Sequence, residues 1–315
     1  MKKYQSGVAI IMAMAVVTMA ALAATAIIVL QSTWARRVQL GNEHAQAQLL
    51  IQTGLDWGRA VLSDDQRAGT ADHAGEPWAM VLPAVPVDNG SLLGHIEDQQ
   101  GRFNLNNLLL DGSINVGQLA AFRRLLVLLN LSPVLALTLA DWLDADQEPQ
   151  PGGGAEDAYY LALPTPALAA NRPLMDIAEL ADVAGFDANA RARLQMYVTA
   201  LPGFAPLNVN TATPEVLAAV IEGLGMDGAR GVVVRRRQAW FRNYADFTSQ
   251  LPAALRSDSG QLMSRNALSE ETLTVSSSFF IASAQVKYGG AQARGSALLA
   301  RSVSGWPRVV WRKYQ

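Results

Sequence analysis

The sequence predicts an α+β protein that is anchored in a membrane by one N-terminal helix. Three observations favour this fold class: an uncharged apolar run near the N-terminus, helical patterns in the middle of the chain, and strand patterns on either side of them. The 315-residue chain contains no cysteine, which excludes thiol catalysis, thiolate metal sites and disulfides. Its formal net charge of −2 does not favour a dedicated nucleic-acid-binding protein, which needs clustered Lys and Arg.

The apolar run from Val8 to Leu30 predicts a membrane-spanning helix. At ~1.5 Å per residue it is long enough to cross a hydrocarbon core of ~30 Å. Two lysines precede it, which favours a cytoplasmic N-terminus and an exported remainder, although two arginines follow it. A cleaved signal peptide is the alternative, but the run is longer than the usual ~7–15 apolar residues of such a peptide.

The same helix is predicted to continue as an amphipathic segment over residues 31–62. Its apolar residues partly follow a 3.6-residue period, whereas Gly41, Gly54 and Gly58 count against an unbroken helix. Residues 1–7 then form a short polar leader before the membrane span over residues 8–30.

Residues 63–110 are predicted to contain a loop rich in Gly, Pro and Asp and then the first strands. Short β-like runs over residues 92–97 and 102–105 lie on either side of a polar turn and indicate a strand pair. Residues 271–315 predict a three-stranded antiparallel meander, which completes the sheet begun by the first strands.

Residues 111–270 are predicted to form an all-helical domain inserted between the two parts of the sheet. Two amphipathic helices, joined at Ser132-Pro133, begin this domain. Residues 172–201 and 208–251 then look like two diverged copies of one helical unit. Each copy has a Gly-apolar-Asp turn between two helices.

The acidic loop after the second of these helices is the strongest candidate binding site. Oxygen ligands on a flexible Pro/Gly loop suit Ca²⁺, and carboxylates this closely spaced repel one another without a cation. Pro149 stands where an EF-hand has its glycine, so a calcium loop of another type and a solvated acidic turn are the two interpretations. The candidate ligands are Asp144, Asp146, Glu148, Glu156 and Asp157.

Residues 207–247 are similar to the helix-hairpin-helix module, whose Gly-x-Gly hairpin presents backbone N–H groups to a DNA phosphate. Here the hairpin would be Gly223-Leu224-Gly225, and several arginines follow it. Against DNA binding, Asp227 lies where the phosphate would bind. A membrane-anchored DNA-binding protein of an uptake system is therefore the alternative function.

The sequence offers little for catalysis. Its three histidines are scattered, and no G-x-S-x-G, H-E-x-x-H or phosphate-binding loop occurs. A membrane-tethered hydrolase with Asp144 and Asp146 as general acid and base is the weakest hypothesis. We therefore expect a protein that is not an enzyme.

In their order along the chain, these features resemble the K-type minor pseudopilins of type II secretion systems, the general secretion pathway protein K family. The resemblance is carried by Gly7 before the apolar run, FNLNNL at residues 103–108, DWLDAD followed by GAEDAYY, and NVNTA at residues 208–212. It implies cleavage by prepilin peptidase between Gly7 and Val8. Met12 then occupies the fifth mature position, where most pilin-like proteins have a glutamate but K-type subunits do not.

The resemblance also implies a fold, a location and partners. We expect a pilin-like head on a long spine helix, a structural Ca²⁺ at the acidic loop, and a methylated mature N-terminus. The chain is expected to span the inner membrane once, with a cytoplasmic N-terminus and a periplasmic head. Its expected partners are the I-type and J-type minor pseudopilins at the pseudopilus tip, the major pseudopilin and the inner-membrane secretion platform. Nucleic acid is not an expected partner.

Overall fold

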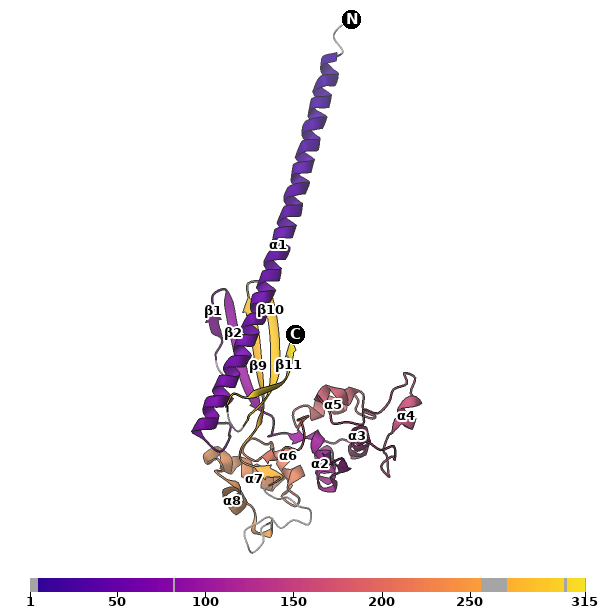
Figure 1. Ribbon diagram of the computed structural model, residues 1–315, viewed down its shortest axis with the longest axis vertical. Helices are drawn as coiled ribbons and strands as arrows, with labels where there is room; N and C mark the ends of the chain where they lie inside the picture. Colours follow the sequence, from indigo (N-terminus) through magenta and orange to yellow (C-terminus); the bar gives the residue numbers. More distant parts are fainter. Residues whose placement is uncertain (1–4, 82, 256–270, 303–304, 315) are drawn as a thin grey trace.

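A single helix of 64 residues, α1 (Gln5–Ala68), is the longest element of the protein. The computed structural model describes residues 5–81, 83–255, 271–302 and 305–314, and in it the N-terminal half of α1 projects far beyond the rest of the chain (Figure 1). The predicted helix over residues 8–62 is confirmed, and it ends at Ala68 without interruption at its glycines. By length and composition, α1 is able to cross a membrane.

The C-terminal half of α1 lies against a five-stranded sheet with the order β1-β2-β9-β10-β11 (Figure 1). Every neighbouring pair in the sheet is antiparallel. The predicted C-terminal meander is confirmed, with a turn at Gly289-Gly290 between its first two strands. The strands are β1 (Val85–Val87), β2 (Gly90–Asp98), β9 (Phe279–Tyr288), β10 (Ala291–Ala300) and β11 (Arg308–Tyr314).

Two of the spine glycines allow α1 to approach the sheet closely. A Cβ atom added at Gly54 would lie 3.2 Å from the Cβ of Ala284, and one added at Gly58 would lie 3.2 Å from the Cβ of Ala282. Both alanines are buried between the helix and the sheet, so neither can move aside. The glycines that weaken the helix in isolation therefore improve its packing.

We expect Gly58→Val to lower the free energy of unfolding by about 1–3 kcal/mol, because the added methyl groups overpack this contact. Gly41→Ala is the matched control, since Gly41 is an exposed glycine of the same helix with no heavy atom within 4 Å of an added Cβ. The control is expected to be neutral or to gain up to about 1 kcal/mol of helix propensity. Urea denaturation of the full chain in detergent compares the two variants, and equal stabilities would contradict the close approach.

A helical domain lies at the end of the sheet remote from the N-terminus of α1 (Figure 1). Its own core is separate from the core between α1 and the sheet. Its helices are α2 (Val116–Leu128), α3 (Leu135–Leu143), α4 (Asp157–Leu161), α5 (Ala188–Leu194), α6 (Pro214–Val220), α7 (Gly225–Gln238) and α8 (Tyr244–Ser249). Short 3₁₀ helices are η1 (Pro77–Ala79), near the sheet, and η2 (Leu105–Leu108), η3 (Ile177–Ala181) and η4 (Ala253–Leu255).

Short two-residue strands connect parts of the helical domain. They are β3 (Phe103–Asn104), β4 (Leu109–Leu110), β5 (Ser113–Ile114), β6 (Val198–Thr199), β7 (Leu207–Asn208) and β8 (Leu273–Thr274). Pairs β3–β6 and β7–β8 are parallel, whereas β4–β5 is antiparallel. The parallel pairs join segments that are far apart in sequence.

The predicted pairing between residues 92–97 and 102–105 is wrong. Strand β2 pairs with β1 and β9, whereas β3 pairs in parallel with β6 inside the helical domain. The reason is burial: the ring of Phe103 stacks on that of Phe122 with centroids 5.5 Å apart, and Leu105 is fully buried in the same core. Apart from Ala71, the helical core thus begins at Phe103, before the predicted domain start at residue 111.

The two helical units differ in detail. The first consists of η3 and α5, and the second of α6 and α7. Gly185 and Gly225, at the corresponding turns, both have positive φ angles, 83° and 63°. Asp187 caps α5 by accepting a hydrogen bond from the Ala190 N–H, whereas Asp227 lies within the first turn of α7. The equivalent aspartates therefore have different roles.

Candidate functional site

The acidic loop connects α3 to α4 and brings three buried carboxylates together. Asp141 lies in the last turn of α3, Asp144 is the C-cap of that helix, and Glu156 is the N-cap of α4. One oxygen of each side chain lies within 4.8 Å of the others. The two helix ends therefore fix the positions of all three groups.

Most of the oxygens in this cluster lack a partner. Both carboxylate oxygens of Asp144 and both of Glu156 are buried without a hydrogen bond in the described part of the chain. Asp141 accepts the backbone N–H of Gln150, at 3.1 and 3.2 Å, and a second backbone hydrogen bond from Ala155. Buried polar atoms are normally paired, because an unpaired buried charge is costly. The cluster thus has the chemistry of a cation site, with oxygen ligands that suit Ca²⁺.

Burial also shifts the pKa values of these carboxyl groups. It raises the pKa of Asp144 to about 6, and repulsion by Asp146 and then Asp141 adds to this effect. Burial, followed by repulsion from Asp141 and Asp144, raises the pKa of Glu156 to about 7. The pKa of Asp141 is raised for the same first reason. A nearby cation would oppose each of these shifts.

Of the five predicted ligands, only Asp144 and Glu156 belong to the cluster. Asp146 is exposed, and its Oδ1 accepts the backbone N–H of Glu148, which is exposed as well. Asp157 accepts the backbone N–H of Ala169 at 2.9 Å. Asp146, Glu148 and Asp157 thus lie outside this cluster, and their ligand roles stay a prediction.

Asp141 is not among the ligands predicted from the sequence, although its spacing from Asp144 indicates that the two carboxylates can lie close together. It precedes Asp144 by three positions in DWLDAD, and residues three apart share one face of a helix. Gly154 lies directly against it, since an added Cβ would come within 2.1 Å of Asp141 Oδ2. Gly154 therefore makes room for the carboxylate of Asp141.

The hairpin before α7 does not combine with the arginines into a DNA site. Gly223 and Gly225 have positive φ angles, as the predicted hairpin requires. Arg236, however, donates to the carbonyl oxygen of Val209, and Arg230 pairs with Asp227 beside the hairpin at 3.3 Å. The next arginine, at position 235, lies ten residues along α7, or ~15 Å from the helix start. This arrangement disfavours the alternative DNA-binding function.

A buried polar network joins the sheet to the helical domain. Oδ2 of Asp98, at the end of β2, accepts hydrogen bonds from Thr211 Oγ1 at 2.5 Å, Ser277 Oγ at 2.8 Å and Asn208 Nδ2 at 3.2 Å. Burial raises the pKa of Asp98 to about 6 in spite of these donors. Two residues of the NVNTA motif thus have a structural role at the junction.

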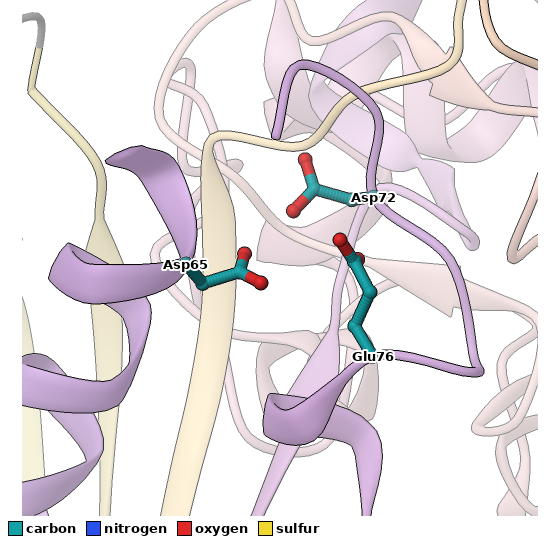
Figure 2. Close-up of side chains that lie close together, drawn as sticks. All are labelled: Asp65, Asp72 and Glu76. Carbon is teal, nitrogen blue, oxygen red and sulfur yellow. The ribbon is translucent and has the colours of Figure 1, made fainter. Parts of the chain in front are cut away.

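A second group of carboxylates lies at the C-terminal end of α1. Figure 2 shows Asp65 on the last turns of the helix, with Asp72 and Glu76 on the following loop, and their oxygens converge. Here the chain supplies its own cation: Arg301 donates from Nη2 to Asp65 and from Nη1 to Asp72. Glu76 accepts from the His73 N–H and from Trp78 Nε1. This group is therefore an ion-pair cluster, unlike the acidic loop.

The predicted processing residues Gly7 and Val8 and the predicted assembly residue Met12 lie on the exposed N-terminal part of α1. Val8 is 58% exposed and Met12 is 64% exposed, and the most apolar window of this helix has no buried residue. An uncovered apolar surface of this size is typical of a segment that contacts lipid or other helices.

Comparisons with known proteins point to a single family. Residues 101–203 and 207–266 match the family described as type II secretion system protein K. The protein of that name from Pseudomonas aeruginosa is 38% identical over 263 residues, which cover 80% of this chain and 78% of the relative. Its counterpart from Aeromonas hydrophila is 35% identical over 248 residues, covering 73% and 72%.

The fold also has a solved counterpart. It is similar to a chain in the crystal structure of the GspK-GspI-GspJ complex from the enterotoxigenic Escherichia coli type 2 secretion system, with a TM-score of 0.74 and 23% sequence identity. The match covers 89% of this chain and 99% of the other. The α+β fold is thus shared.

Proposed function

This chain belongs to the protein K family of the type II secretion system, and from that premise we propose that it forms the tip of the pseudopilus. Members of this family are minor pseudopilins, structural subunits rather than known enzymes. The observation that carries the tip assignment is the position of the helical domain, which covers the end of the sheet remote from the apolar helix (Figure 1).

The proposed mechanism is positional. The exposed apolar half of α1 packs laterally against the corresponding helices of other subunits, which provides affinity. The helical domain occupies the space in which a further subunit would stack, and so it caps the fibre. Met12 carries no carboxylate, so this subunit makes none of the pairings with a neighbour's N-terminal amine that the resemblance implies for most pilin-like proteins.

Several partners follow from the same proposal. The related chain from enterotoxigenic Escherichia coli was solved in a complex with GspI and GspJ, which supports assembly of this chain with its own I-type and J-type minor pseudopilins. This trimer would prime assembly by the major pseudopilin on the inner-membrane platform. Prepilin peptidase would first cut between Gly7 and Val8, after which the mature N-terminus is methylated. The chain would then span the inner membrane once, with a periplasmic head.

We also propose that Asp141, Asp144 and Glu156 hold a structural Ca²⁺. The four unpaired oxygens of Asp144 and Glu156 support this assignment. When bound, the ion neutralises the mutual repulsion of the three carboxylates. As shared ligands of the ion, these residues would tie the C-terminal end of α3 to the N-terminal end of α4, which would stabilise the loop in a domain without disulfides.

The tip assignment predicts that an antibody against the helical domain labels one end of each pseudopilus in electron micrographs of cells that produce all the subunits. Gly7→Val is expected to retain the leader, because a side chain replaces the glycine at the cleavage site, and to abolish end labelling. Gly41→Ala, an exposed glycine of the same helix, is the control and is expected to keep both cleavage and labelling. Labelling along the length of the fibre would contradict the tip position.

A further inference from the structure

A recess on the helical domain is formed by the C-terminal end of α7, the segment that follows it, and α8. It has a volume of about 660 Å³. Arg235, Trp240 and Arg242 are exposed along it, and 41% of the Trp240 surface is accessible. Helices α7 and α8 lie at the end of the molecule remote from the apolar part of α1, so the recess is far from the membrane anchor (Figure 1).

The recess is positively charged. Within the described residues, neither Arg235 nor Arg242 forms an ion pair, whereas the nearby Arg230 pairs with Asp227. Among the described residues that line the recess, Asp246 is the one acidic residue, and its Oδ2 accepts the backbone N–H of Arg242 at 3.1 Å. Two arginines and one partly engaged carboxylate thus line this recess, in a chain whose overall net charge is negative.

The aromatic side of the recess is held rigidly. The indole of Trp240 stacks on the imidazole of His73, with ring centroids 4.7 Å apart and an interplanar angle of 15°. The next residue, Phe241, exchanges two backbone hydrogen bonds with the buried side chain of Asn210, each 2.9 Å long. Trp240 is therefore exposed and yet fixed, which lowers the entropic cost of using it in binding.

Exposed tryptophan and unpaired arginine are the residue types that contribute most to protein interfaces. Guanidinium groups bind carboxylates through two parallel hydrogen bonds, and an indole face offers a platform for apolar side chains. We propose that this recess binds an acidic, extended segment of a partner protein, whose carboxylates pair with Arg235 and Arg242 while an apolar side chain lies on Trp240. This binding is independent of the assembly role of the chain.

The test uses the full chain in detergent and a fluorescein-labelled peptide, Gly-Asp-Glu-Trp-Asp-Gly, titrated by fluorescence polarisation at low ionic strength. We expect saturable binding that the double variant Arg235→Gln/Arg242→Gln weakens at least about tenfold. Trp240→Ala is expected to weaken binding as well. Arg123→Gln removes the same charge from an exposed position on α2 and is expected to leave the affinity unchanged.

Two further probes make the result decisive. A peptide with Asn and Gln in place of Asp and Glu is expected not to bind, since the carboxylates supply the recognition. A labelled DNA duplex is expected to bind more weakly than the acidic peptide. The proposal is overturned if the peptide does not bind, if the double variant binds it as well as the Arg123→Gln control does, or if the duplex binds more tightly than the peptide and loses this binding in the double variant. None of these results bears on pseudopilus assembly.

Discussion

Replacement of Arg301 by methionine is expected to lower the free energy of unfolding by about 3–5 kcal/mol, because it leaves buried carboxylates without their cation. The side chain of Arg301 is only 8% exposed, and those of its partners Asp65 and Asp72 are 7% and 5% exposed. Its guanidinium also lies 4.4 Å from the ring centroid of Phe280. These two ion pairs join the end of α1 and the following loop to the residue that directly follows β10.

This loss of stability is expected to depend on pH. Burial raises the pKa of Asp65 to about 6 even with Arg301 present, and removal of the cation raises it further. A carboxyl group with a raised pKa in the folded state binds its proton more tightly there, so the folded state is favoured at low pH and disfavoured as pH rises. The deficit of Arg301→Met is therefore expected to be larger at pH 8 than at pH 5.

Urea denaturation at the two pH values measures this difference. Arg312→Met is the control, because Arg312 on β11 makes only a half-exposed contact of 3.5 Å with Asp56. Such exposed pairs contribute about 0–1 kcal/mol, so the control is expected to lose little stability at either pH. If Arg301→Met is no less stable than Arg312→Met, the buried ion pairs of Arg301 do not contribute the expected free energy of unfolding.

Elements with a strong local pattern were predictable from the sequence. The apolar run and the amphipathic repeat indicate α1, and alternating residues around Gly289-Gly290 indicate β9 and β10. The pairing of Phe103 with Val198 was not predictable in this way, because two-residue parallel strands carry no periodic signal. What fixes β3 is the core around it. Asn104 Nδ2, for example, donates to the carbonyl oxygen of Gly203, 99 positions away.

The candidate metal site, too, was only partly predictable from the sequence. Composition and spacing identify the acidic loop, and resemblance assigns it to Ca²⁺. The orientation of the end of α3 and the start of α4 decides which carboxylates converge. The positions of acidic residues in the sequence do not reveal this orientation. Asp141 joins the cluster from inside α3, whereas Asp157, next in sequence to Glu156, accepts the Ala169 N–H instead. Neighbours in sequence therefore separate, and residues from different helices meet.

Removal of Ca²⁺ with EGTA is expected to lower the melting temperature of the full chain by roughly 5–10 °C. Binding to the folded state alone contributes about 2.7 kcal/mol when the free ion is at a hundred times its dissociation constant. For a protein of this size, 1 kcal/mol corresponds to roughly 2–4 °C. Differential scanning fluorimetry with and without the chelator measures the shift, and addition of excess Ca²⁺ is expected to reverse it.

Substitutions of the carboxylates distinguish a Ca²⁺ site from an acidic loop that binds no ion. They are expected to remove the stabilisation by Ca²⁺ but to raise the melting temperature in EGTA. Asp144→Asn and Glu156→Gln remove ligands, so both variants are expected to lose their response to Ca²⁺. In EGTA, however, both are expected to melt above the wild-type chain, since each removes one charge from a cluster of repelling carboxylates. Asp146→Asn alters an exposed carboxylate outside the cluster and is expected to keep the Ca²⁺ response. If all four proteins ignore EGTA, the carboxylates are not Ca²⁺ ligands. If Asp146→Asn loses the response together with Asp144→Asn and Glu156→Gln, the ligand set is the wider one predicted from the sequence, which includes Asp146.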